Sequence, residues 1–435
     1  MTHRLKHTII AFALTPCFVF LGNLMELNPV HVQVKKFVAK SAQWLDREYH
    51  APDQSRLLTQ VVCLDDLGTQ TSKLKGVNGE PVNVLNRAKL LELVTKISKN
   101  GNKVIALDID FSLECPDEQG RVQEACQGTG TRLVPSMSTD PELLSTFAAL
   151  SPSTEVVVGV WRQASSPREW WFMPGASGKL PNAGVMSQFS ETVMEIPLVH
   201  EHDKVANPTF VETVRNLAEP QKTTEHRAAW HEKLFEDRFE ETADSSINTK
   251  SAFVTFGSLK PLLKTKVNAQ DVLDNKAKIS PDKVVYAGPC TKMAIAANDV
   301  HDSPDFHGNI PGIFVHAAAT HSLLESPVFI PTELASNWFE IFLGWSMILL
   351  ENSVIAILCR RLPGHRVAAT TERILKVWRL ALFAFFVTLA IQAALNYKII
   401  WTEVMFLFLG LVVSDPIEAV YEWIKHKFTR RKMSL

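Results

Sequence analysis

Two apolar segments of the chain end in pairs of acidic residues, and these carboxylates are the side chains best placed to do chemistry. The segment "KVIALDIDFS" carries Asp108 and Asp110, which point to the same side because they are two residues apart in an extended chain. The segment "TQVVCLDD" ends in Asp65 and Asp66. Where parallel strands end side by side, such oxygens can hold a hard divalent cation such as Ca²⁺ or Mg²⁺, or a cationic ligand.

A second interpretation of these acids requires no ligand. Asp110 can cap the following turn, while Asp65 and Asp108 accept hydrogen bonds from nearby backbone amides. Both interpretations stay open on the sequence alone. A hydrolytic site ranks last, because no serine, cysteine or histidine base stands at a recognisable spacing beside the acids. We therefore predict that the protein is not an enzyme.

A polar segment further along the chain mixes imidazole and carboxylate groups. In "NDVHDSPDFHG", the residues Asp299, His301, Asp305 and His307 combine ligand types that suit a transition metal. The alternative is a solvated loop, because no tetrahedral ligand spacing can be recognised. His316 follows on an expected helix, either as a buried histidine with its own hydrogen-bond partner near the pocket wall or, if partly exposed, as a pH-sensitive element. The expected ligand-binding set comprises Asp65, Asp66, Asp108, Asp110, Asp299 and His316.

Hydrophobic patterns around these residues predict alternating strands and helices. Strands are expected at Val61–Leu64, Val104–Ile109, "EVVVGVW" and Lys283–Cys290, and helices at Leu85–Lys99, Pro141–Leu150 and after Pro311-Gly312. This order predicts one α/β domain with a mostly parallel sheet at its core. The charged stretch Thr223–Ala243 has a narrow apolar stripe, which favours a surface helix.

The cysteines provide one candidate cross-link. Cys115 and Cys126 bracket the polar loop "CPDEQGRVQEAC" and could close it as a disulfide in an oxidising compartment. Cys63 is expected to be a buried strand residue. The formal net charge of the 435 residues is -1, so no basic surplus points to nucleic acid as a partner.

Four apolar segments predict an α-helical bundle of four membrane spans. Thr8–Leu24 follows Arg4 and Lys6 and is expected to be an uncleaved signal anchor. Three further segments approach the roughly 20 residues that cross a bilayer core, and they are Trp338–Cys359, Val377–Asn396 and Ile399–Trp423. Basic residues follow the second and fourth spans, which places both termini in the cytoplasm and the large domain outside it.

The expected organisation therefore has four parts along the chain. They are an anchor at 1–28, an outer domain at 29–335, a three-span region at 336–423 and a basic tail at 424–435. Glu351 and Asn352 interrupt the second span, where an ionisable group is costly unless it faces protein. They are expected either to serve the function directly or to join helices or protomers through polar contacts.

The order of these pieces resembles the second class of CHASE sensor domains, extracytoplasmic sensors associated with cyclases and histidine kinases. The resemblance rests on "VVCLDD", "KVIALDIDFS", "VVVGV", "KVVYAGPC", "IPGIFVHAAATHSLL" and the three closing spans. The family's closing "PG-x-x-x-HA" element is matched by Pro311, Gly312, His316 and Ala317. The chain departs from the family's usual "GATA" phrase at Pro289 and Cys290.

The resemblance implies a sensor in the inner membrane that detects an unknown ligand outside and passes the signal through its spans. Because no output domain follows the last span, the signal would pass to a separate output protein, and a homo-oligomer embedded in membrane lipid is expected. The competing hypothesis is a structural module that organises a membrane complex without a small ligand. An open, acid-lined strand edge would favour sensing, and an edge filled by neighbouring groups would favour assembly.

Overall fold

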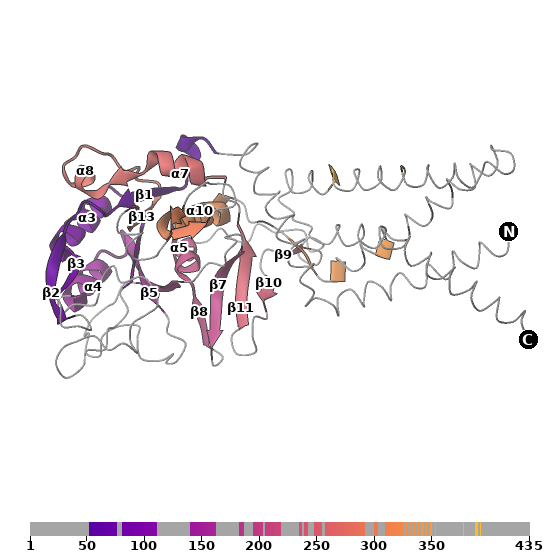
Figure 1. Cartoon of the computed structure of the whole chain (residues 1–435), viewed down its shortest axis with the longest axis horizontal. Coiled ribbons are helices and arrows are strands. Elements are labelled where there is room, and N and C mark those ends of the chain that lie inside the picture. The colour runs from indigo at the N-terminus through magenta and orange to yellow at the C-terminus, as the bar shows by residue number, and fades with distance from the viewer. Residues whose placement is uncertain are drawn as a thin grey trace, which may run out of the picture. The chain divides into compact units, whose positions relative to one another are not determined.

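Figure 1 shows the computed structural model of the chain. It describes residues 52–75, 81–110, 140–161, 182–186, 195–202, 205–218, 235–236, 239–241, 248–254, 257–291, 300–302, 309–325 and scattered positions from 328 to 392. The chain divides into two compact units. The larger comprises 43–226 and 237–328, and the other comprises 1–42, 227–236 and 329–435.

A six-stranded sheet forms the centre of the larger unit. Its strands lie in the order β12 (Val267–Asn268), β1 (Thr59–Cys63), β13 (Val284–Gly288), β4 (Val104–Asp110), β5 (Glu155–Trp161) and β6 (Asn182–Met186). Every neighbouring pair is parallel. This confirms the predicted α/β core with a parallel sheet.

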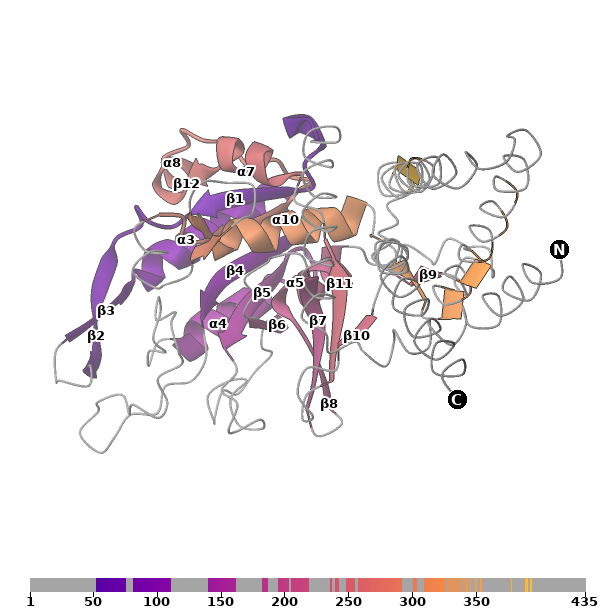
Figure 2. The same cartoon turned by 45° about the vertical axis from the view of Figure 1, so that its right-hand side comes forward.

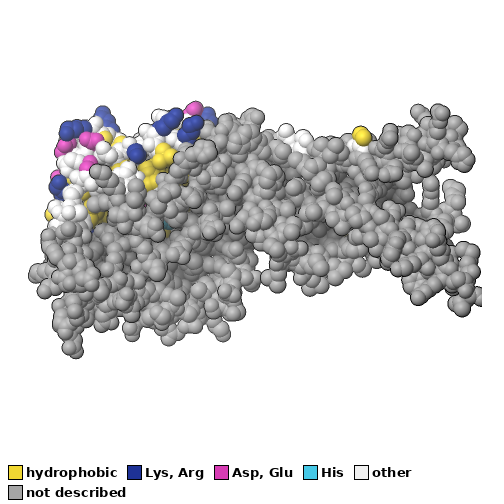
Figure 3. All heavy atoms as spheres, in the orientation of Figure 1, with side chains coloured by type: hydrophobic (Ala, Val, Ile, Leu, Met, Phe, Trp, Pro, Cys, Tyr) yellow, Lys and Arg dark blue, Asp and Glu magenta, His cyan; other side chains and the backbone are white. Residues whose placement is uncertain are grey.

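The central strands are continuous apolar runs because helices cover both faces of the sheet. One face packs against α3 (Arg87–Lys99), α4 (Asp140–Ala149) and α8 (Ala269–Leu273). The other face packs against α5 (Phe210–Ala218), α7 (Leu259–Thr265) and α10 (Gly312–Glu325). Where α3 and α8 lie, the described surface carries Lys, Arg, Asp and Glu side chains with hydrophobic ones among them (Figure 3).

Helix α3 shows how the local sequence sets an element's bounds. The Asn86 side chain caps its start by accepting a hydrogen bond from the Lys89 backbone N–H at 3.1 Å. Leu90, Leu93, Val94 and Ile97 form the buried stripe, at the spacing of one helix face. The chain then turns at Gly101, whose φ of 93° is the left-handed conformation that glycine favours.

Helix α10 is buried from Gly312 to Leu324 because it is enclosed by two sheets and neighbouring helices. The second sheet is antiparallel, in the order β10 (Phe239–Glu241), β11 (Asn248–Phe253), β7 (Glu195–His202) and β8 (Val205–Pro208). Leu198 and Ala252 of this sheet pack with Ala319 and Leu323 of α10. Figure 2 shows α10 against the parallel sheet, with α5 beside it. A helix with apolar residues on all its faces is suited to this position, and α10 also carries buried polar residues, among them His316, Thr320 and His321.

The expected surface helix at Thr223–Ala243 is wrong where the structure describes it. Residues Phe235–Glu236 form β9, which pairs with β16 (Ile330–Pro331), and Phe239–Glu241 form β10. Pairing of β9 with the distant β16 and of β10 with the nearby β11 outweighs the weak helical pattern. Short remaining elements are η1 (Gln54–Arg56), the hairpin of β2 (Thr69–Lys75) with β3 (Pro81–Leu85), and the pair β14 (Val300–Asp302) with β15 (Asn309–Pro311).

Among the described residues, none belongs to a helix with both the length and the apolar character needed to cross a bilayer. The expected anchor lies wholly outside the described residues, and the three later spans lie almost wholly outside them. The four-span bundle therefore stays a prediction.

The contact between β6 and α5 makes a first testable prediction. A Cβ on Gly184 would lie 2.4 Å from the Phe210 Cα and 2.8 Å from its backbone N, so Gly184→Ala must push α5 away from the sheet. We expect this overpacking to lower the free energy of unfolding by about 3 kcal/mol, measured by chemical unfolding of the full-length protein in detergent. Gly68→Ala is the control, because Gly68 has a φ of 77° but open space around its Cβ position, so only backbone strain is added. Equal losses for the two variants would contradict the tight packing.

Candidate functional site

The acidic pairs lie at the carboxyl edge of the parallel sheet, on strands that are not direct neighbours. Strand β13 runs between β1 and β4. Cys63 pairs with Gly288, and the pairing of Ala287 with Leu107 sets Gly288 beside Asp108. The carboxyl edge is where open α/β sheets bind ligands. Whether this edge can bind a ligand therefore depends on which groups already contact each acid.

Asp65 holds the turn that follows β13. Its Oδ2 accepts a hydrogen bond from the Cys290 backbone N–H at 2.8 Å. Its Oδ1 accepts from the Thr291 backbone N–H at 3.1 Å and from the Thr291 hydroxyl at 2.9 Å. The carboxylate is thus engaged by groups that lie over 200 residues further along the chain.

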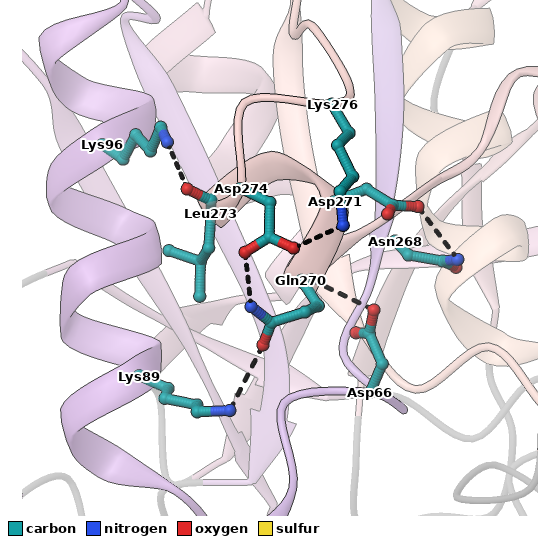
Figure 4. Close-up of polar contacts among 9 residues, drawn as sticks. All are labelled: Asp66, Lys89, Lys96, Asn268, Gln270, Asp271, Leu273, Asp274 and Lys276. Atoms are coloured by element: carbon teal, nitrogen blue, oxygen red, sulfur yellow. Dashed lines mark hydrogen bonds and ion pairs between the residues drawn. The ribbon is translucent and has the colours of Figure 1, made fainter.

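Asp66 belongs to a different set of contacts, drawn in Figure 4. Its Oδ2 accepts from the Gln270 backbone N–H at 3.1 Å, in the first turn of α8. The Gln270 side chain also donates to Asp274 and accepts from Lys89 of α3. Hydrogen bonds from Lys276 and then from Gln270 hold the pKa of the Asp274 carboxyl below its ordinary value. Asp66 therefore fixes α8 to the end of β1.

Asp108 is only 2% exposed and lies between the sheet and α10. Its Oδ2 is 3.1 Å from Nδ1 of His316, which is itself buried in α10. The rings of Phe210 and His316 pack edge to face, with their centroids 5.4 Å apart. The ladder between β4 and β5 is irregular between Leu107 and Asp110, as at a β-bulge, which can re-aim a side chain.

Gly288 permits the close approach that this pair requires. A Cβ at Gly288 would lie 2.9 Å from both the Cβ and the backbone O of Asp108. It would also lie 3.0 Å from the Cδ1 of Ile313 in α10. Glycine at the end of the "VVYAG" strand therefore lets β13, β4 and α10 meet.

Further hydrogen bonds join α10 to the sheet along its length. The Tyr286 hydroxyl bonds to that of Thr320, and burial raises the pKa of the Tyr286 phenol far above its ordinary value, so it remains neutral. The Thr59 hydroxyl donates to the Ala317 carbonyl at 3.0 Å. The Leu58 backbone N–H donates to His321 Nδ1 at 3.2 Å. His316 and His321 thus contact opposite ends of the sheet.

A disulfide joins Cys63 and Cys290 at this edge, with an S–S distance of 2.09 Å. Cys63 is a buried strand residue, as expected, but its pairing was missed because the two cysteines are 227 residues apart in sequence. The usable signal was that Cys63 ends one apolar strand and Cys290 closely follows another. The predicted partners Cys115 and Cys126 lie outside the described residues.

The remaining candidates are only partly described. Asp110 ends β4, and His301 lies in β14 opposite Ile310, each defined by its backbone. Asp299, Asp305, His307, Glu351 and Asn352 fall outside the described residues. Within the described part of the chain, the one group of three or more histidine, cysteine, aspartate or glutamate side chains whose potential ligand atoms lie within 4.8 Å of one another is Cys63, Asp65 and Cys290. Asp65, Asp66 and Asp108, which the sequence analysis assigned to one ligand-binding set, therefore each contact a different group in the structure.

The buried pair generates a second prediction. Asp108→Ala removes the carboxylate from beside the His316 ring, so we expect the free energy of unfolding to fall by about 3 kcal/mol. Chemical unfolding followed by circular dichroism measures this loss. Asp66→Ala removes an exposed acid that caps α8, and a much smaller loss is expected. Similar losses for the two variants would show that the buried pair contributes little.

A family model described as the CHASE2 domain matches residues 40–351. No curated protein and no solved structure matches the chain.

Proposed function

The chain belongs to the CHASE2 domain family, which comprises extracytoplasmic sensor domains, and on this premise we propose that it is a membrane-anchored sensor. In this proposal the outer domain detects a signal outside the cytoplasm, and the membrane spans relay it to a separate output protein. The protein acts without enzymatic activity and as a homo-oligomer. A ligand must bind two arrangements of the domain unequally for such a relay to work.

The position of α10 is the observation that supports a relay. Its N-terminal half contacts the carboxyl edge through Ile313 and through His316, which meets Asp108. Its C-terminal half contacts the start of β1, where His321 accepts from Leu58. The chain before β1 and the chain after α10 both lead to segments predicted to enter the membrane. A shift of α10 driven at the carboxyl edge would therefore reach both connections.

Exposed apolar side chains support the proposed membrane attachment. Leu334, Trp338, Phe342 and Leu349 are helical residues spaced to share one helix face, and each is more than half exposed. Lipid would cover such a stripe at less cost than water. We accordingly propose an anchor and three later spans in the inner membrane, with both termini in the cytoplasm.

One observation favours the alternative, an assembly module with no small ligand. In the described part of the carboxyl edge, Asp65, Asp66 and Asp108 are all engaged by neighbouring groups. This is the filled edge expected of a structural module. Sensing and assembly therefore differ in whether the carboxyl edge and the start of β1 are energetically coupled.

The topology can be tested by labelling single cysteines in spheroplasts with a membrane-impermeant maleimide. Lys278→Cys, at an exposed position of the outer domain, should react in intact spheroplasts. Arg366→Cys, in the predicted cytoplasmic loop, should react only after permeabilisation. Both variants are made in a chain whose cysteines outside the Cys63–Cys290 disulfide are replaced by serine. Labelling of both positions from the same side would overturn the proposed topology.

The coupling can be tested by hydrogen exchange at the Leu58 amide in the full-length protein. His321→Ala removes its acceptor and should speed exchange roughly threefold to tenfold. Asp108→Asn acts at the opposite end of α10 and should speed exchange at Leu58 as well, because a relay transmits the perturbation.

Leu90→Ala serves as the control, because Leu90 is buried on the other face of the sheet and its truncation lowers global stability without touching α10. The two variants are compared under conditions that give them equal global stability. Faster hydrogen exchange at the Leu58 amide in Asp108→Asn than in Leu90→Ala then supports sensing. Equal exchange in these two variants would favour assembly.

A further inference from the structure

The carboxyl edge contains a set of metal-binding groups that the disulfide conceals. We propose that Cys63, Cys290 and Asp65 form a site for a thiophilic divalent cation of the Zn²⁺ class once the disulfide is reduced. This inference goes beyond the proposed sensor function and does not depend on it. It also replaces the hard cation expected from the acids with a cation of different chemistry.

The geometry already brings the three groups together. The two sulfurs and a carboxylate oxygen of Asp65 all lie within 4.8 Å of one another. Cys63 ends β1 and Asp65 follows two residues later, while Cys290 follows the end of β13 by two residues. The Cα atoms of the two cysteines are 5.3 Å apart, so reduction releases two thiols from adjoining positions of one rigid sheet edge.

The donor set determines the class of cation. Two thiolates and one carboxylate match the sulfur and oxygen ligands of Zn²⁺, which is usually four-coordinate in proteins. Three protein ligands leave one coordination position for water or another ligand. Ca²⁺ and Mg²⁺ prefer oxygen ligands throughout and are poorly suited to this set.

The surroundings position the ligands and leave a route of entry. Both cysteines are buried, whereas Asp65 is partly exposed and Thr291 is exposed. The Cys290 backbone N–H donates to the Asp65 carboxylate and helps to hold its orientation, as outer hydrogen bonds commonly do for metal ligands. The exposed side of Asp65 is the side from which a reductant and then a cation would arrive.

The chemistry balances with a dithiol as the reductant. The dithiol transfers two electrons and two protons to the Cys63–Cys290 bond and becomes a disulfide itself, leaving two thiols on the protein. The cation then displaces the two thiol protons as it binds. In the oxidised protein the sulfurs carry no charge, and Asp65 alone is a weak ligand. Cation binding is therefore confined to the reduced state.

Co²⁺ is a suitable probe, because thiolate coordination produces an intense charge-transfer absorption that water or carboxylate coordination lacks. The experiment uses the full-length protein in detergent micelles, with serine at every cysteine except Cys63 and Cys290. A water-soluble phosphine reduces the disulfide and is itself oxidised to the phosphine oxide. We expect the reduced protein to develop the absorption with one Co²⁺ bound per chain and to lose it when Zn²⁺ displaces the Co²⁺. The oxidised protein should show no such absorption.

Two variants and a matched control separate the site from adventitious binding. Cys290→Ser should abolish the absorption, and Asp65→Asn should weaken Co²⁺ binding roughly tenfold or more. Asp66→Asn is the control, because Asp66 is the adjacent acid but contacts α8 instead, and its binding should be unchanged. Circular dichroism reports whether each reduced protein keeps its fold.

Three results would overturn the proposal. One is a reduced protein that stays folded without taking up Co²⁺, which would make the disulfide a structural staple and Asp65 a turn cap. Another is a reduced protein that unfolds even when Zn²⁺ is present. The third is equal binding by Asp65→Asn and Asp66→Asn, because the carboxylate would then not be a ligand.

Discussion

A helix that is buried on every side must find a partner for each polar side chain that it carries. A buried polar group without a hydrogen-bond partner destabilises the fold by more than a typical hydrogen bond stabilises it. Helix α10 meets this constraint at His316, which contacts Asp108, at Thr320, which contacts Tyr286, and at His321, which accepts from Leu58. Each contact fixes the helix at a different height along the sheet. Together they set both its rotation and its position along its own axis.

The surrounding packing follows from the place of that helix. Gly288 has no side chain because Asp108 and Ile313 occupy the space that a Cβ would need. The alternation of side chains along β1, β13 and β4 sends one set toward α10 and the other toward α3 and α4. Asp108 falls on the α10 side, so a residue that reads as a ligand in the sequence becomes the partner of a histidine.

The four inner strands of the parallel sheet could be predicted because burial on both faces produces continuous apolar runs, whereas the outer strands β12 and β6 were not predicted. The run "EVVVGVW" coincides with β5, and the run before Cys290 contains β13. The order of the strands could not be predicted, since nothing in the sequence placed β13 between β1 and β4. For the same reason the acids could not be assigned. The groups that engage Asp65, Asp66 and Asp108 all come from segments more than 200 residues later.

The central place of β13 also constrains how the domain can form. Strands β1 and β4 are separated by β13, which begins about 175 residues after the end of β4, so neither can pair with its inner neighbour until β13 has been made. Helix α10 arrives later still. The sheet therefore cannot be completed from the first half of the domain alone, and the unpaired inner edges of β1 and β4 are surfaces of the kind that promote aggregation before folding is complete.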